Sequence, residues 1–385
     1  MDTPWQPPQD TVPGPADHHD ELTQKLLAWL ALPTPREQRR FLEAHPELLA
    51  PQSDLILNEH LTEIAGHREK GEQVREALRV LQDARARGGT ETAIREAFVN
   101  AYGGFALDLP PWLEAVGQQL AELKSALSAF QTAVRRTDLL REALSRAQDE
   151  PDLAPEALAT LHYELAVAWY ENPYANFRPA LEAALVECEV ALSVSTLTRY
   201  PCQYAHVQNT LGQVCRNRQA GEKRDNVEQA LRCQYEALRV WIRETFPYEY
   251  AQTQSYLGMA YWVRLAGEKR ENLERAIACF HEALHILTRE TFPSEYARIQ
   301  NSLGIVYWKR VGGEQRTNLE QAIACFHEAL RLRTSEASPI EYAQTQNNLG
   351  NVYWVRLAGE RRDNVEQAIT CYRQALHAFD QEPYP

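Results

Sequence analysis

The segment HEALH, His281 to His285, has the residue types and spacing that zinc hydrolases use. Two histidines four residues apart lie on one face of a helix, where they can bind zinc, and a glutamate between them can activate a bound water. The equivalent positions read YEALR from Tyr235, HEALR from His327 and RQALH from Arg373, and no third ligand is evident. We therefore interpret the match as a product of a repeated sequence. We expect no metal, no cofactor and no enzymatic activity, with a zinc metallohydrolase as the alternative.

Cysteines also recur at a fixed step of 46 residues, at Cys233, Cys279, Cys325 and Cys371. This step places the thiols in separate repeats, about 10 Å apart by the usual helix-packing distance, which argues against a shared metal. A Cys–His protease needs its nucleophile on an exposed turn, and nothing in the sequence indicates one. Residues at the same position in successive repeats are called a column below. We interpret this cysteine column as small buried apolar residues.

Composition limits the partners and the compartment. The net charge of −13 argues against nucleic acid or an anionic membrane as the main partner, because both bind clustered basic residues. No apolar run approaches the roughly 18 residues that span a bilayer. The acidic, proline-rich start is unlike a secretory signal, and the odd number of seven cysteines fits a reducing compartment. We predict a cytoplasmic protein.

The first part of the chain divides into a tail and a helical region. Residues 1–19 are rich in Pro, Asp, Gln and His, and we predict a disordered tail there. From residue 20 to residue 154, capping residues and apolar stripes at helical spacing recur, as in DELTQKLLAWLAL. We predict an N-terminal helical domain over residues 20–154, without strands.

The remaining part of the chain repeats itself every 46 residues. Prolines mark the step, at Pro201, Pro247, Pro293, Pro339 and Pro385. One step back from the first of them is Pro155, after which apolar residues fall where the later copies have them. A fixed period in this range is typical of a solenoid. We predict five repeats over residues 155–385, of which the first is degenerate.

Each repeat is expected to hold two helices. The first begins after the proline, which needs no N–H in the first turn. The second is expected to be capped by asparagine, at Asn226, Asn272, Asn318 and Asn364. A glycine recurs within the first helix, at Gly212, Gly258, Gly304 and Gly350. Because a mid-helix glycine costs roughly 1 kcal/mol relative to alanine, we expect a neighbouring helix to pass too close for a side chain.

The spacing inside each repeat resembles that of the tetratricopeptide repeat (TPR). Gly258 is followed at +3 by Tyr261, and Ala276 is followed at +4 by Phe280 and then at +3 by Ala283. The repeat is longer than the TPR of about 34 residues, by equal amounts on both sides of this packing centre. The resemblance implies an all-α, right-handed superhelical solenoid in which the first helix of each pair lines a concave groove.

A polar row with tryptophans is expected on that groove. Amides can bond the backbone of an extended peptide and tryptophan can take its apolar side chains, so we predict a groove for a partner protein or peptide. The alternative is that the tryptophans are buried between repeats and the amides bond one another. The predicted groove residues are His206, Asn209, Gln213, Arg216, Gln252, Ser255, Met259, Trp262, Arg298, Asn301, Ile305, Trp308, Gln344, Asn347, Asn351 and Trp354.

Charged positions repeat as well. Arg218, Arg264, Arg310 and Arg356 each precede a glutamate by four residues, at Glu222, Glu268, Glu314 and Glu360. This spacing predicts a solvated ladder of ion pairs on one rim of the solenoid, with a site for an acidic ligand as the alternative.

Two segments, EYAQTQNNLGNVYW (residues 341–354) and NLEQAIACFHEAL (residues 318–330), resemble the long TPR repeats of bacterial proteins that also carry a caspase-like CHAT protease domain. RRFLEAHPELLAPQSDLI and EQVREALRVLQDAR are similar to the segment that precedes such repeats. The resemblance implies an interaction scaffold in bacterial signalling or defence. The alternative is a regulatory or inhibitory subunit, or a substrate, of a separately encoded CHAT protease.

The last repeat is expected to expose apolar surface. Terminal repeats of solenoids normally carry a polar cap, and the sequence stops at Pro385, where a sixth repeat would begin. We expect the outer face around Ala368, Ile369, Tyr372 and Leu376 to be partly uncovered. It would then dock on a partner or on another copy of the chain, with a chain cut from a longer protein as the alternative.

Overall fold

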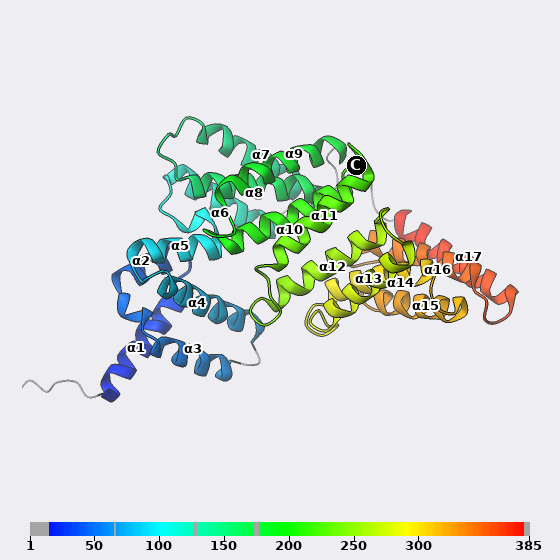
Figure 1. Ribbon diagram of the computed structural model, residues 1–385, viewed down its shortest axis with the longest axis horizontal. Helices are drawn as coiled ribbons and strands as arrows, with labels where there is room; N and C mark the ends of the chain where they lie inside the picture. Colours follow the sequence, from blue (N-terminus) through cyan, green and yellow to red (C-terminus); the bar gives the residue numbers. More distant parts are fainter. Residues whose placement is uncertain (1–14, 65–66, 127–128, 173–176, 381–385) are drawn as a thin grey trace, which may run out of the picture. The chain divides into compact units, whose positions relative to one another are not determined.

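The chain is helical throughout the part that the structure describes. This computed structural model describes residues 15–64, 67–126, 129–172 and 177–380, and there it contains seventeen α-helices, two short 3-10 helices and no strand (Figure 1). The predicted all-α fold class is confirmed. Within these ranges, no helix combines the length and the apolar character that crossing a bilayer requires.

Two compact units make up the chain. The first is drawn from Met1–Leu165 and Val190–Gln203, and the second from Ala166–Glu189 and Tyr204–Pro385. The boundary that the sequence predicts at residues 154 and 155 stays a prediction. Of the predicted disordered tail, residues 1–14 lie outside the described residues, whereas residues 15–19 belong to a helix that begins at Pro15.

The first unit packs its helices around a core that includes Leu26, Trp29, Leu81 and Phe98, all nearly inaccessible to solvent. The Trp29 indole Nε1 donates a hydrogen bond of 2.8 Å to the backbone oxygen of Gln38, so the polar edge of this buried ring is satisfied. The elements that lie wholly within it are α1 (Pro15–Leu30), α2 (Pro35–Ala44), η1 (Pro46–Leu49), α3 (Gln52–Glu63), α4 (Arg68–Ala86), α5 (Glu91–Tyr102), η2 (Gly104–Ala106), α6 (Pro111–Ala126) and α7 (Ala129–Ala147).

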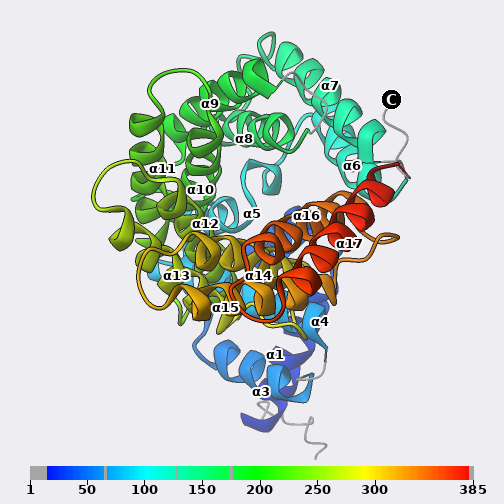
Figure 2. The same ribbon diagram turned by 90° about the vertical axis from the view of Figure 1, so that its right-hand side faces the viewer.

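Helix pairs follow one another in the rest of the chain. Each first helix from α12 onward packs mainly against the second helix of its own repeat and also against the second helix of the preceding one. Figure 2 shows the last pair, α16 and α17, side by side in the foreground. The pairs are α8 (Pro155–Glu171) and α9 (Phe177–Val194), α10 (Pro201–Asn217) and α11 (Lys223–Leu238), α12 (Pro247–Val263) and α13 (Lys269–Leu284), α14 (Pro293–Lys309) and α15 (Gln315–Leu330), and α16 (Pro339–Val355) and α17 (Arg361–Asp380). This is the predicted solenoid of helix pairs.

The helix starts are partly as the sequence predicts. Each first helix begins at its proline. The predicted asparagine caps are wrong, because the second helices begin three residues earlier. In α13 the capping residue is Glu268, and Asn272 is buried in the first turn. The Asn272 Nδ2 donates a hydrogen bond of 2.8 Å to the backbone oxygen of Ala266. The asparagine therefore fixes the turn between the two helices.

The recurring glycine lies where the two helices of a repeat cross. A Cβ atom added at Gly258 would lie 3.0 Å from the nearest ring carbon of Phe280, and one at Gly304 would lie 2.8 Å from Phe326. At Gly350 the nearest atom would be a Tyr372 ring carbon at 2.7 Å. These distances are shorter than ordinary van der Waals contact. The expected close approach of a neighbouring helix is confirmed.

The repeated arginines pair with different partners from those predicted. Arg264 does not bond Glu268. Its Nε and Nη2 donate hydrogen bonds of 2.7 Å and 3.0 Å to the two carboxylate oxygens of Glu228, on the second helix of the preceding repeat. The same bidentate pair recurs one repeat earlier and in the next two repeats, as Arg218–Glu182, Arg310–Glu274 and Arg356–Glu320. These arginines therefore tie consecutive repeats together.

The exposed face of the last pair is smaller than the sequence predicts. Ala368 is fully buried, and Tyr372 is half-buried against Gly350. Ile369 and Leu376 are exposed, at 42% and 65% of their surface, whereas Ile323, the equivalent of Ile369 in the preceding repeat, is only 7% exposed. In the last repeat the apolar positions that neighbouring repeats cover elsewhere are therefore open.

Candidate functional site

Fourteen of the sixteen predicted groove residues are half-buried or exposed. The other two, Asn209 and Ser255, are 6% and 0% exposed. The Gln234 side chain of α11 donates a hydrogen bond of 3.1 Å to the backbone oxygen of Asn209, whereas the equivalent Asn301 and Asn347 are half-buried and exposed. Since neither side chain reaches the surface, both are removed from the predicted groove.

The three tryptophans differ in exposure. Trp262 and Trp354 are 38% and 51% exposed. Trp308 is half-buried and packs against the core together with Met259 and Ile305. Burial between repeats, the alternative that the sequence left open, therefore applies in part to Trp308 and does not apply to the other two.

Several of the predicted amides bond neighbouring side chains. The Tyr372 hydroxyl donates a hydrogen bond of 3.0 Å to Asn351 Oδ1. The Gln252 Nε2 donates to the hydroxyl of Tyr248 at 3.3 Å. These bonds hold the amides in place, and each amide keeps further hydrogen-bonding capacity for a ligand.

A pocket of about 550 Å³ lies on the second unit among α12, α14, α16 and the segment that connects α15 to α16. It brings together two predicted residues, Gln252 and Arg298, with side chains that the prediction missed. The most informative of these are Tyr256, Glu295, Arg333 and Glu341. The volume is within the range of pockets that bind small ligands or single peptide side chains.

The pocket holds two arginines in unlike settings. The Arg298 guanidinium lies 5.0 Å from the ring centroid of Tyr256, and its Nη1 donates to the Met259 sulfur at 3.5 Å. The Arg333 Nη1 donates a hydrogen bond of 2.9 Å to Thr345 Oγ1. Burial lowers the pKa of Arg333, and the charge of Arg298 lowers it further against the opposing effect of Glu341. Burial also raises the pKa of Tyr256.

The HEALH segment, which suggested zinc catalysis, contacts neighbouring side chains. His281 Nε2 lies 3.0 Å from the Tyr307 hydroxyl, and Glu282 accepts hydrogen bonds from Arg243 and Tyr250. Among the described residues, no group of three or more His, Cys, Asp or Glu side chains is arranged to hold a metal ion.

The cysteine column is largely shielded from water. Cys233 and Cys371 are buried, and Cys279 and Cys325 are half-buried. Burial raises the pKa of Cys233, Cys279 and Cys325 to about 12 and that of Cys371 to about 11. These thiols therefore stay protonated at neutral pH, which is unfavourable for a nucleophile.

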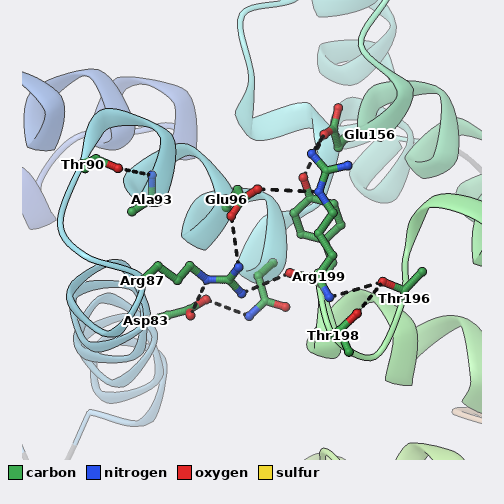
Figure 3. Close-up of polar contacts among 11 residues, drawn as sticks. Asp83, Arg87, Thr90, Ala93, Glu96, Glu156, Thr196, Thr198 and Arg199 are labelled. Carbon is green, nitrogen blue, oxygen red and sulfur yellow. Dashed lines mark hydrogen bonds and ion pairs between the residues drawn. The ribbon is translucent and has the colours of Figure 1, made fainter.

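The first unit contains a separate cluster of charged residues (Figure 3). The Glu156 carboxylate is almost fully buried, and it accepts hydrogen bonds of 2.8 Å from the Tyr200 hydroxyl and 3.1 Å from Arg199. Burial alone would raise the pKa of Glu156, but hydrogen bonds from its own backbone N–H and from Tyr200, with the charges of Arg95 and Arg199, lower it overall.

The same cluster continues into α4 and α5. Arg87 pairs with Asp83 at 2.7 Å and with Glu96 at 3.3 Å, and it donates to the backbone oxygen of Arg199 at 3.1 Å. The cluster thus fixes the turn that precedes α10 against α4, α5 and the start of α8. Since Glu156 is ionised and bonded within the protein, we interpret this cluster as structural.

Comparisons with known proteins add little to this description. No protein-family model matches the chain, and no curated protein matches it. The crystal structure of BtubC (BKLC) from P. vanneervenii is similar to 70% of this chain over 95% of its own, with a TM-score of 0.42 and 18% sequence identity. The helix pairs themselves show that this is a protein with a helical-repeat architecture.

Proposed function

We propose that this chain is an interaction scaffold that binds a peptide segment of a partner protein along the first helices of its repeats. The observation that carries the proposal is the pocket of about 550 Å³ that α12, α14 and α16 share. Its lining combines amide, aromatic and charged groups, which suits an extended peptide better than a purely apolar ligand.

Exposed apolar residues support the same proposal. Trp262 and Trp354 lie near the ends of their helices and are more than a third exposed. The turns that follow the first helices expose Leu265, Val311 and Leu357, at 67%, 62% and 59% of their surface. Apolar residues that recur at one place in successive repeats present a continuous edge for a partner, whereas isolated ones would carry little meaning.

The class of partner follows from the resemblance to TPR–CHAT proteins. In those proteins repeats and a caspase-like protease belong to one chain, so a separately encoded protease of that kind is the first partner to examine. In that case the scaffold would act as a regulatory or inhibitory subunit, or as a substrate.

Peptide selection tests the proposal directly. Random peptides displayed on phage are selected on the immobilised full chain, and the dissociation constants of the recovered peptides are measured by fluorescence polarisation. Gln252→Ala and Trp354→Ala should weaken binding by about tenfold or more, as anchor residues do at other interfaces.

A matched control separates this effect from a general surface effect. Arg232 is exposed on α11, a second helix, and Arg232→Ala should leave peptide binding unchanged. The proposal is wrong if no peptide binds above background. It is equally wrong if the recovered peptides bind all three variants as well as the wild type.

A further inference from the structure

Two arginines are among the pocket residues that depart from the repeat pattern. The position of Arg298 holds histidine or glutamine in the other clear repeats, at His206, Gln252 and Gln344. The position of Arg333 holds apolar residues, at Trp241, Leu287 and Phe379. Both exceptions fall in the same pocket. The other residues of the two columns share a chemical character, polar without a fixed charge in the first and apolar in the second, so these arginines answer a different requirement.

Arg333 stands where the two preceding repeats place core residues. Trp241 and Leu287 are 1% and 0% exposed. An arginine at such a position gives up much of its hydration, which is costly unless a partner compensates. Its protein partner is the neutral hydroxyl of Thr345. The cost of partly burying this charge is therefore not offset by an ion pair within the described residues.

Arg298 also lacks an ion pair with a carboxylate of the described residues. No carboxylate of the described residues lies within 4.0 Å of the guanidinium of Arg298 or of Arg333. The repeated arginines such as Arg264 differ in this respect, because they form bidentate pairs with glutamates. Each pocket arginine therefore has several N–H donors that no carboxylate in the described part of the chain occupies.

The two glutamates that line the pocket occupy a position that recurs in the repeats. Glu295 and Glu341 occupy a position that also holds Glu249, in the first turns of α12, α14 and α16, where a negative charge stabilises the helix. Glu295 accepts a hydrogen bond of 3.2 Å from Tyr248, and Glu341 is exposed to solvent. Because glutamate holds this position in three successive repeats, the two glutamates do not account for Arg298 and Arg333, which depart from their columns.

We propose that Arg298 and Arg333 form an oxyanion-binding site, which takes a carboxylate or phosphate group of the ligand in the pocket. The planar guanidinium matches either group with two parallel hydrogen bonds. The first turn of α14, which contributes Pro293 and Ser294 to the pocket, adds the positive end of a helix. This inference rests on the proposed function and assigns an anionic anchor to the bound peptide.

Small probes test the site without a known partner. Isothermal titration of the full chain at low ionic strength uses N-acetyl-glutamate α-amide, inorganic phosphate and the neutral N-acetyl-glutamine α-amide. We expect at least one of the two anions to bind, the neutral amide not to bind, and the affinity to fall as sodium chloride is added. The first two probes distinguish a side-chain carboxylate from a phosphate group.

The variants come from the repeats themselves. Arg298→Gln and Arg333→Leu install the residues that α12 and the preceding repeat already hold at these positions, so the fold should persist. Each should weaken anion binding by about tenfold. Arg331→Gln is the control, since Arg331 is exposed and pairs with Glu328 outside the pocket. Circular dichroism and the melting temperature verify that each variant is folded.

Two results would overturn the site: no binding of either anion to the wild type, or equal binding to wild type, Arg298→Gln and Arg333→Leu. The peptides from the selection above separate this inference from the proposed function. If they bind the arginine variants as well as the wild type, the anionic anchor is wrong and the scaffold stands. If no peptide is selected but an anion binds at the arginines, the site stands and the peptide scaffold is wrong.

Discussion

The glycine at the helix crossing offers the sharpest test of how a repeat is held together. A Cβ atom at Gly304 would lie 2.8 Å, 2.9 Å and 3.0 Å from three ring carbons of Phe326. This ring is fully buried and packs in the central core of the solenoid, so it has little room to move. Any side chain at residue 304 must therefore separate α14 from α15 or tilt the ring.

The magnitude follows from two opposing effects. Alanine would gain about 1 kcal/mol over glycine in helix propensity, while overpacking a core costs about 1–3 kcal/mol. Gly304→Ala should therefore destabilise by about 0–2 kcal/mol. Valine has less propensity to offset the clash and adds two methyl groups, so Gly304→Val should destabilise by about 3 kcal/mol. Its melting temperature should fall by roughly 6–12 °C.

The assay is urea denaturation of both variants, followed by circular dichroism, in wild-type and Phe326→Leu backgrounds. If the ring causes the cost, Gly304→Val should lose at least about 1 kcal/mol less in the Phe326→Leu background. Gly117, inside α6, is the control because a Cβ atom there would meet nothing within 4 Å. Gly117→Ala should stabilise by up to about 1 kcal/mol. An unchanged stability of Gly304→Val, or equal costs in both backgrounds, would refute the reasoning.

Three further outcomes are expected. Arg333→Leu should raise the free energy of unfolding by about 1–3 kcal/mol, because it replaces a partly buried, unpaired charge; a loss in urea denaturation would contradict this. Burial lowers the pKa of His206 to about 4, so the unfolded chain binds a proton first and stability should fall as pH drops from about 6.5 to 4, by about 3 kcal/mol. His206→Gln should abolish that slope, and an unchanged slope would assign it elsewhere. If the exposed face of the last pair docks on another copy of the chain, sedimentation should show a self-association that Ile369→Glu with Leu376→Glu abolishes, and a wild type that is monomeric at high concentration would exclude this docking.

The repeat period made the helices predictable. Prolines marked the first residue of each first helix, and the glycine column indicated the crossing that Phe280 and Phe326 fill. A column shows which residue recurs, but it does not show which partner that residue meets. Arg264 was therefore paired with a glutamate four residues ahead, whereas the structure pairs it with Glu228, 36 residues back, on the preceding repeat.

The groove was harder to predict than the fold. Equivalent positions of the first helices differ in exposure, so Ser255 was expected in the groove and is buried, whereas its equivalent Asn347 is exposed. Tyr256, its neighbour, lines the pocket instead. The signal for Arg333 was present in the sequence as a charged residue in an otherwise apolar column. Such a signal is found only when each column is searched for the residue that departs from it as well as for the residues that agree.

Exceptions carry information about function in a repeat protein because the fold supplies its own control. Every repeat must pack against its neighbours, so a residue that satisfies packing is free to recur. A residue that departs from its column at a cost in stability needs another reason to persist. Arg333 is such a residue, since the preceding repeat shows that Leu287 fills the same position fully buried. If Arg333→Leu stabilises the chain and weakens anion binding together, stability and binding are opposed at that one position.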